Sequence, residues 1–157
     1  MDKSRGLHGA NVMRWPTHFV AGLAAGLLVT TEPAALIVSG LSALIPDIDI
    51  PTSKVGRASP AFSTIVNIAF GHRGLFHSLL ATGLIYLLVL KLFPAYSIYF
   101  LVGYLSHLML DCLTPAGVPL LWPIPFRFRV PIIKTGSVLE IILFVCIATF
   151  LAKEVFL

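Results

Sequence analysis

The chain has 157 residues, of which 57% are hydrophobic and only 11% are charged, and its mean hydropathy is +0.94. Soluble domains carry about 25% charged residues, so this composition excludes an ordinary soluble protein and indicates a bilayer as the solvent. The formal net charge of +4 comes from basic residues in the polar gaps between apolar runs. That distribution is typical of membrane topology, and without a basic tail or an aromatic-interleaved basic patch it argues against a nucleic-acid partner.

Residues 1–17 are polar, and we expect a loose N-terminal segment there within a single domain that covers residues 1–157. Apolar runs follow at residues 19–30 and 34–45, separated by a Thr-Glu-Pro interruption. They predict either one long tilted helix or a hairpin of two short helices. Gly, Ala and Ser in both arms favour close helix packing and therefore the hairpin. A cleaved signal peptide is not expected, because no A-x-A site closes the first run.

The rest of the chain alternates polar loops with apolar runs. A short mixed segment at residues 62–70 predicts a helix lying at the membrane interface. Apolar runs at residues 79–93, 97–113 and 138–151 predict three more helices, and the proline-rich stretch 114–136 predicts a long loop. Together these segments predict an all-α integral membrane helical bundle with four to five membrane-embedded helices.

The distribution of basic residues bears on the topology. In the hairpin arrangement the N-terminus and the loops at residues 46–76 and 114–136 lie on one side. Only Lys91 and Lys153, two of the eleven basic residues, then remain on the opposite side. A single first span would move the N-terminal basic residues across and nearly equalise the two sides. The positive-inside rule prefers the hairpin and places these loops in the cytoplasm.

Ionisable side chains stand at or inside the edges of the apolar runs. They are His18, Asp47, Asp49, His72, His77, His107, Asp111 and Glu140. In the hairpin topology all of them come out near the same membrane face. Imidazoles and carboxylates together are ligands for zinc, manganese and iron, so the pattern predicts a divalent-metal site for one or two ions.

Two pairs within this set have informative spacing. His107 and Asp111 are four residues apart and project from one helix face. An intramembrane pair of this kind indicates function, with a structural hydrogen-bonded pair between helices as the alternative. Asp47 and Asp49 flank one isoleucine, so both carboxylates can face one side, although a helix-terminating polar loop would also explain them.

The stretch GHRGLFHS at residues 71–78 carries His72 and His77, whose spacing fits a turn leading into a helix. His72 by itself could equally be a solvated loop residue. Arg73 lies within the motif and is expected to bind an anionic head group. For Arg57, Arg127 and Arg129 the positive-inside signal is the first interpretation and head-group binding the second.

Several motifs, in this order, resemble those of the bacterial YdjM family. They are TH at 17–18, LIPDIDIPTS at 44–53, GHRGLFHSLL at 71–80, GYLSHLMLDCLTPAGVPLLWP at 103–123 and TGSVLE at 135–140. The resemblance implies a membrane-bound, metal-dependent hydrolase of the bacterial inner membrane, with phospholipase activity as a finer expectation. By position, the family's motif residues correspond to His18, Asp47, Asp49, His72, His77, His107 and Asp111. Phe76 departs from the threonine associated with that position.

The leading hypothesis is therefore an integral membrane hydrolase. A divalent metal, zinc or manganese, would activate water against a phosphoester of a lipid or lipid-linked substrate. The best ligand candidates are His18, His77, His107 and Asp111. Asp47 and Asp49 would be bridging ligands or, for Asp49, the base, and Arg73 would bind the anionic head group.

Two other functions use the same residues. In a divalent-ion binding or transport protein they would form an ion pathway between helices. Such a pathway needs polar residues through the membrane's depth, whereas here they gather at one face, which favours the enzyme. A structural membrane protein with satisfied buried pairs is the third hypothesis.

Overall fold

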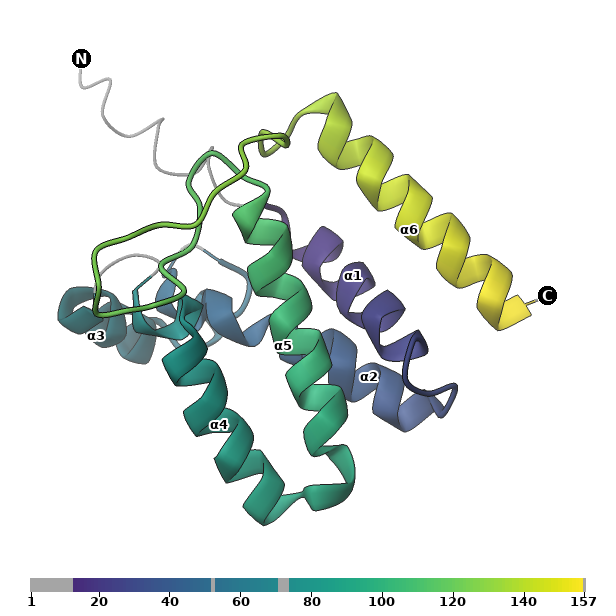
Figure 1. Cartoon of the computed structure of the whole chain (residues 1–157), viewed down its shortest axis with the longest axis horizontal. Helices are drawn as coiled ribbons and strands as arrows, with labels where there is room; N and C mark the ends of the chain where they lie inside the picture. The colour runs from purple at the N-terminus through teal and green to yellow at the C-terminus, as the bar shows by residue number, and fades with distance from the viewer. Residues whose placement is uncertain (1–12, 52, 71–73, 157) are drawn as a thin grey trace.

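The computed structural model describes residues 13–51, 53–70 and 74–156 (Figure 1). Within these ranges the protein is all-α, as the sequence predicted, with one isolated antiparallel bridge between Val118 and Phe128. The six α-helices are α1 (Trp15–Leu27), α2 (Pro33–Ser42), α3 (Pro60–Phe70), α4 (Leu79–Leu92), α5 (Ser97–Cys112) and α6 (Val138–Phe156).

Helices α1 and α2 form the hairpin rather than one long helix (Figure 1). Glu32 ends the connection as the N-cap of α2, and its carboxylate accepts hydrogen bonds from the backbone N–H groups of Ala34 and Ala35 at 3.1 and 2.6 Å. Pro33 occupies the first turn of the helix, where its missing N–H costs nothing. Ser39 Oγ then donates to the Gly22 carbonyl at 2.8 Å and joins the two arms.

Helix α5 is the central element, packed against α1, α2 and α4. It forms a second hairpin with α4 through the 3-10 helix η5 (Pro94–Tyr96). Gly103 lets α5 approach α2 closely, because a Cβ at this position would overlap the carbonyl oxygen of Ser39. Phe100, Tyr104 and Leu108 on α5 form the apolar core together with Val118.

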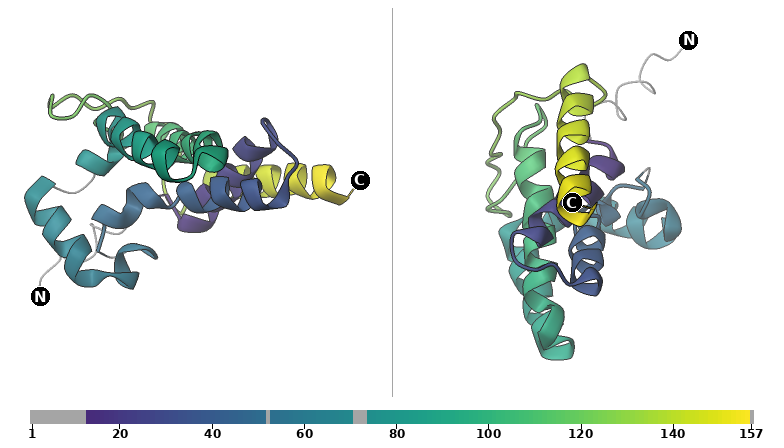
Figure 2. Two further views of the ribbon diagram at one scale, coloured as in Figure 1. Left: turned by 90° about the horizontal axis from the view of Figure 1, so that it is seen from below. Right: turned by 90° about the vertical axis from the view of Figure 1, so that its right-hand side faces the viewer.

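Short elements close one end of the bundle. The 3-10 helices η2 (Ile45–Asp49) and η4 (Leu75–His77) contact each other, and α3 packs on η2 and on η3 (Gly56–Ala58). Figure 2 shows α3 at the opposite end of the molecule from the C-terminal end of α6. The segment expected to be an interfacial helix is thus helical and lies at the end that holds η2.

Four to five membrane-embedded helices were expected from the sequence. Several α-helices present large apolar side chains to the exterior, such as Leu84 and Leu87 on α4 and Ile141 and Val145 on α6, all more than half exposed. None of the α-helices in the described ranges combines the length and the apolar character needed to cross a bilayer.

Candidate metal centre

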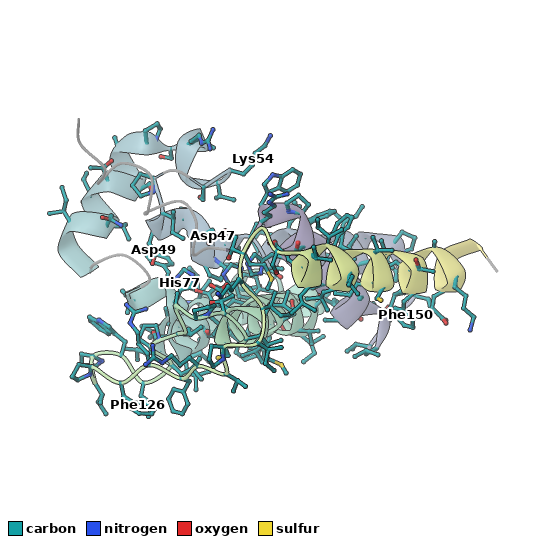
Figure 3. All side chains as sticks on the ribbon, turned by 90° about the horizontal axis from the view of Figure 1, so that it is seen from above. Asp47, Asp49, Lys54, His77, Phe126 and Phe150 are labelled. Carbon is teal, nitrogen blue, oxygen red and sulfur yellow. The ribbon has the colours of Figure 1, made fainter. Side chains whose placement is uncertain are left out.

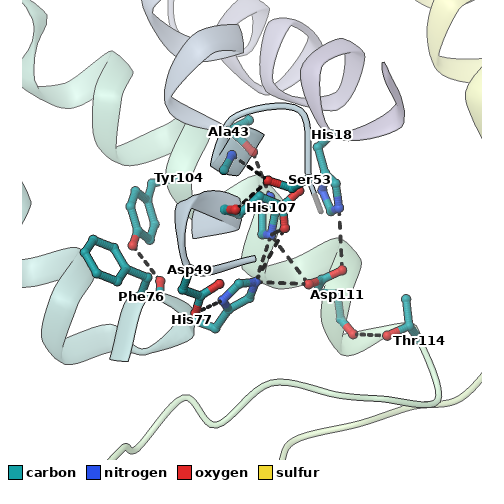
Figure 4. A network of polar contacts seen from close by, with 12 residues as sticks. His18, Ala43, Asp49, Ser53, Phe76, His77, Tyr104, His107, Asp111 and Thr114 are labelled. Atoms are coloured by element: carbon teal, nitrogen blue, oxygen red, sulfur yellow. Dashed lines mark hydrogen bonds and ion pairs between the residues drawn. The ribbon is translucent and has the colours of Figure 1, made fainter. Parts of the chain in front are cut away.

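Six ionisable side chains from four elements meet at one buried point (Figure 4). They are His18 on α1, Asp47 and Asp49 on η2, His77 on η4, and His107 and Asp111 on α5. Asp47 is 2% exposed and the other five are fully buried. Figure 3 shows Asp47, Asp49 and His77 together at one end of the molecule, far from Phe150 on α6.

Helix α5 contributes the local pair that the sequence indicated. His107 Nε2 lies 3.5 Å from Asp111 Oδ2, one turn further along the same face. His107 Nδ1 lies 2.7 Å from the carbonyl oxygen of Ala43, at the C-terminal end of α2. A carbonyl can only accept, so Nδ1 carries the proton and Nε2 turns its lone pair toward the centre.

The 3-10 helix η2 turns two carboxylates inward. Pro46 stands in its first turn, and the geometry is helical rather than extended, so Asp47 and Asp49 both lie against the bundle. Backbone contacts hold the turn in place: Ser53 Oγ donates to the Asp47 carbonyl at 2.7 Å, and Asn67 Nδ2 donates to the Asp49 carbonyl at 2.9 Å. The two acidic residues are thus fixed from outside the centre.

Asp49 orients His77. Its Oδ2 atom lies 3.2 Å from His77 Nδ1, and the other ring nitrogen, Nε2, points at His107 Nε2 from 3.3 Å. Burial alone lowers the pKa of the His77 imidazole, but the carboxylates of Asp49 and Asp111 outweigh burial and raise that pKa to about 9. The carboxylates therefore favour a proton on His77, whereas burial and the neighbouring His18 lower the pKa of His107.

Three distances within the centre match those of a tetrahedral coordination shell. His77 Nε2 and His107 Nε2 are 3.3 Å apart, and each is 3.5 Å from Asp111 Oδ2. Asp47 Oδ1 lies 3.9 Å from the first and 3.8 Å from the second. With metal–ligand bonds of about 2.0–2.2 Å, neighbouring ligand atoms of a tetrahedral zinc site are separated by about 3.3–3.6 Å. The atoms of His77, His107 and Asp111 have these separations, whereas Asp47 Oδ1 lies farther out and groups with His18 and His107.

His18 extends the centre on the other side of Asp111. Its Nε2 atom lies 3.5 Å from Asp111 Oδ1, so the two oxygens of that carboxylate face different imidazoles. The His18 ring stacks on His107 with centroids 3.8 Å apart. Two overlapping groups of side chains could hold an ion: His77, His107 and Asp111, and His18, Asp47 and His107. A bridging Asp111 is compatible with one ion or two.

The polar atoms of the centre fit a cation. Among the described residues, no hydrogen-bond partner is present for Asp47 Oδ1, Asp49 Oδ1 or either ring nitrogen of His18. Each buried polar atom without a partner lowers the free energy of unfolding by about 1–3 kcal/mol. An ion held by His18, Asp47 and His107 would give Asp47 Oδ1 and one nitrogen of His18 a partner at once, whereas one proton on His77 could serve only its nearest neighbours.

Glu140 does not join the cluster, although its position in the sequence had placed it near the same face. Its Oε1 atom accepts from the backbone N–H of Arg14 at 2.8 Å and from Thr17 Oγ1 at 3.2 Å. The side chain therefore ties the start of α6 to the start of α1. His72 and Arg73 lie outside the described residues.

Sequence reasoning missed the groups that position the candidate ligands. Asn67 gave no signal, since a lone asparagine in a short helix is common. The Ala43 carbonyl gave an indirect one, because the last carbonyls of any helix need partners and α2 ends next to His107. Which side chain would meet that carbonyl could not be read from the sequence.

Comparison with known proteins agrees with the motifs. The family model described as YdjM inner membrane protein matches residues 13–156. "Inner membrane protein YdjM" of Escherichia coli (strain K12) is 47% identical over 119 residues, and the match covers 70% of this chain and 60% of that protein. The protein of the same name from Shigella flexneri gives the same values.

A relative from Bacillus subtilis (strain 168), "Uncharacterized protein YvsG", is 38% identical over 136 residues, which are 82% of this chain and 85% of that protein. The chain thus spans about 60% of the length of the two YdjM relatives and most of the third. No solved structure shows a significant match. On the extent of the family match and these identities, the chain belongs to the YdjM family of inner membrane proteins.

Proposed function

We propose that this chain is a membrane-bound, metal-dependent hydrolase, formed by a single domain over residues 1–157, that cleaves a phosphoester of a lipid or lipid-linked substrate. One observation carries the proposal. Three buried ligand atoms from His77, His107 and Asp111 converge at separations suited to a tetrahedral divalent ion, and Asp47 forms an overlapping group with His18 and His107. The imidazole-rich set favours zinc, with manganese as the second choice.

Each residue has a role in this proposal. His77, His107, Asp47 and Asp111 would hold the ion, and His18 would bind on the far side of Asp111. A divalent ion held there supplies Lewis acidity and lowers the pKa of water. Asp49 would keep His77 in the binding tautomer through Nδ1, and its second oxygen, Oδ1, would accept a proton.

The remaining roles rest on the motif and on the relatives. His72 would add a ligand and Arg73 would bind an anionic head group. The relatives named inner membrane proteins support the bilayer as the partner and the inner membrane as the location. Four to five membrane-embedded helices, with the metal centre facing the cytoplasm, complete the proposal.

A divalent-ion binding or transport protein is the second candidate. Burial favours it, since five of the six side chains in the centre are fully covered and the sixth is 2% exposed. A substrate phosphoester needs a path to the ion, whereas a bound or transported ion needs only the ligands. Metal content alone cannot separate the two functions, but metal content together with turnover can.

The test is metal content by mass spectrometry on full-length, detergent-purified protein, followed by hydrolysis of phospholipid and simple phosphoester substrates. We expect about one or two zinc ions per chain. The metal content per chain should fall at least about tenfold in the Asp111→Asn variant and in the His107→Ala Asp111→Ala double variant, because both remove central ligands. Glu154→Gln makes the same carboxylate-to-amide change at an exposed site and should keep all of it.

Three results are informative. Full metal content in Asp111→Asn would disprove the metal centre. Metal that is lost in the variant, together with phosphoester hydrolysis that is lost with it, supports the hydrolase. Stoichiometric, ligand-dependent metal without hydrolysis of any phosphoester would instead favour the ion-binding protein.

A further inference from the structure

A second feature of the molecule lies beside the metal centre. The loop between α5 and α6 encloses an open groove of about 1120 Å³, large enough for much of a lipid molecule. Residues 119–120 and 122–130 form most of its wall, and Gly74 and Cys112 complete it. The six candidate ligands take no part in this wall, so the groove is separate from the metal centre.

The wall of the groove is apolar and exposed. Ile124, Phe126 and Val130 are 56%, 55% and 55% exposed, and the rings of Phe126 and Phe128 pack edge to face at 4.8 Å. Because these side chains line a groove, they offer contact area to another apolar molecule. The lining therefore suits a hydrocarbon chain.

Two arginines alternate along the sequence with the apolar residues of this wall. In the sequence FRFRV, Arg127 and Arg129 lie between Phe126, Phe128 and Val130, and both arginines are exposed and line the groove. The segment is extended at Phe128, where it pairs with Val118, and successive side chains of an extended segment point to opposite sides. Guanidinium groups bind phosphate through paired hydrogen bonds. Arg127 and Arg129 therefore lie on one side of this segment, and Phe126, Phe128 and Val130 lie on the other, all of them lining the groove.

The groove is held in shape by backbone hydrogen bonds. Val118 and Phe128 exchange two of them, each 2.9 Å, and the Val130 N–H donates to the Cys112 carbonyl at 2.7 Å. Gly117 has φ +62°, and a Cβ there would lie 2.7 Å from the Cβ of Arg129. Only glycine combines that conformation with so close an approach, so the arm carrying the arginines has a defined position.

Two residues in the wall of the groove belong to, or cap, elements that also carry candidate ligands. Cys112 follows Asp111 directly on α5, and Gly74 is the N-cap of η4, which ends at His77. The Leu79 N–H donates to the Leu120 carbonyl at 2.9 Å and attaches the wall to the start of α4. Figure 3 places Phe126 at the same end of the molecule as His77.

We infer that this groove binds an anionic phospholipid, with an acyl chain along Phe126, Phe128 and Val130 and the phosphate on Arg127 and Arg129. The inference deepens the proposed function and rests on it for the identity of the substrate, since it assigns the lipid class that would reach the metal. The binding itself depends only on the groove.

Trp122 lines the groove and provides the test. The chain has two tryptophans, so a Trp15→Phe background isolates the fluorescence of Trp122. Full-length protein in neutral detergent is titrated with phosphatidylglycerol or phosphatidylcholine that carries bromine on one acyl chain. We expect half-maximal quenching at a several-fold lower mole fraction of the anionic lipid, and no reversal by inorganic phosphate.

The variants decide whether the arginines cause this preference. Arg127→Gln Arg129→Gln should abolish it, whereas Lys134→Gln Lys153→Gln removes the same charge elsewhere and should leave it intact. Equal quenching by both lipids, an equal loss in the lysine variant, or reversal by inorganic phosphate would overturn the inference. A circular dichroism spectrum and a melting temperature equal to those of the unsubstituted protein show that the arginine variant is folded.

Failure of this inference can be told apart from failure of the proposed function. Loss of the lipid preference is read by quenching, and loss of the metal centre is read by zinc content. The Asp111→Asn variant should lose zinc and retain the preference for the anionic lipid. If the preference for the anionic lipid is absent while zinc content and phosphoester hydrolysis persist, lipid binding in the groove is disproved. The proposed hydrolase function is then unaffected.

Discussion

At the scale of single side chains, Asp49 acts on the candidate metal centre by positioning His77, and a substitution can test this role. Its carboxylate accepts from His77 Nδ1 and so holds Nε2 toward His107. In Asp49→Asn the side chain keeps its shape but loses the charge that makes the imidazole a stronger ligand. We expect the zinc affinity to fall about 10–100-fold, with folding retained.

Competition with a chromophoric chelator measures this affinity. Glu32→Gln is the matched control, because it makes the same carboxylate-to-amide change at the N-cap of α2, outside the centre. It should lower stability slightly and leave zinc affinity unchanged. Wild-type zinc affinity in Asp49→Asn would show that Asp49 does not position His77.

At the scale of elements, the contact between α2 and α5 places His107 beside the end of α2. A Cβ at Gly103 would overlap the Ser39 carbonyl and the Ser42 hydroxyl, so the two backbones must separate in Gly103→Ala. Overpacking of this kind costs about 1–3 kcal/mol, and we expect a lower melting temperature in detergent. Zinc affinity should fall as well, because the Ala43 carbonyl moves away from His107.

Gly83→Ala is the control for that substitution. Gly83 lies inside α4, and a Cβ there would meet nothing within 4 Å. Alanine at an open helical position should stabilise the protein by up to about 1 kcal/mol. If both variants changed the melting temperature in the same direction and by the same amount, close α2–α5 packing would not be the cause.

The elements themselves were largely predictable from local sequence. The runs at 79–93, 97–113 and 138–151 became α4, α5 and α6, and the 114–136 stretch is a loop. Glu32 and Pro33 begin a new helix by local capping chemistry, which is why the hairpin could be anticipated. The bridge between Val118 and Phe128, which shapes the groove, was not anticipated, since pairing within a loop depends on contacts across it.

At the scale of the whole molecule, the candidate ligands join α1, η2, η4 and α5, which are distant in sequence. An ion bound by all four elements stabilises only the folded state. At a free zinc concentration 100 times Kd, we expect about 2.7 kcal/mol of added stability and a matching rise in melting temperature.

Thermal unfolding in detergent, with and without a zinc chelator, measures this effect. The Asp111→Asn variant is the control and should melt at the same temperature in both conditions. A wild-type protein whose melting temperature ignored both chelator and added zinc would contradict a metal centre that joins these elements.

Local sequence was enough to identify the residue types of the centre and the spacing of its helical pair. His107 and Asp111 had to share a helix face because the helical repeat puts residues four apart on one side. The apolar runs determined an all-α protein because their length and composition favour helices. Six of the eight ionisable residues found at the edges of these runs meet in the structure: His18, Asp47, Asp49, His77, His107 and Asp111.

Which of these side chains face one another depends on the packing of the helices and could not be read from the sequence. That packing turned the two oxygens of Asp111 toward different histidines, directed Asp49 to His77 Nδ1, and assigned Glu140 to the junction of α1 and α6. The physical reason is that distances of 3–4 Å between residues far apart in the chain depend on how closely the helices pack. At Gly103 that packing depends on the absence of a single carbon atom.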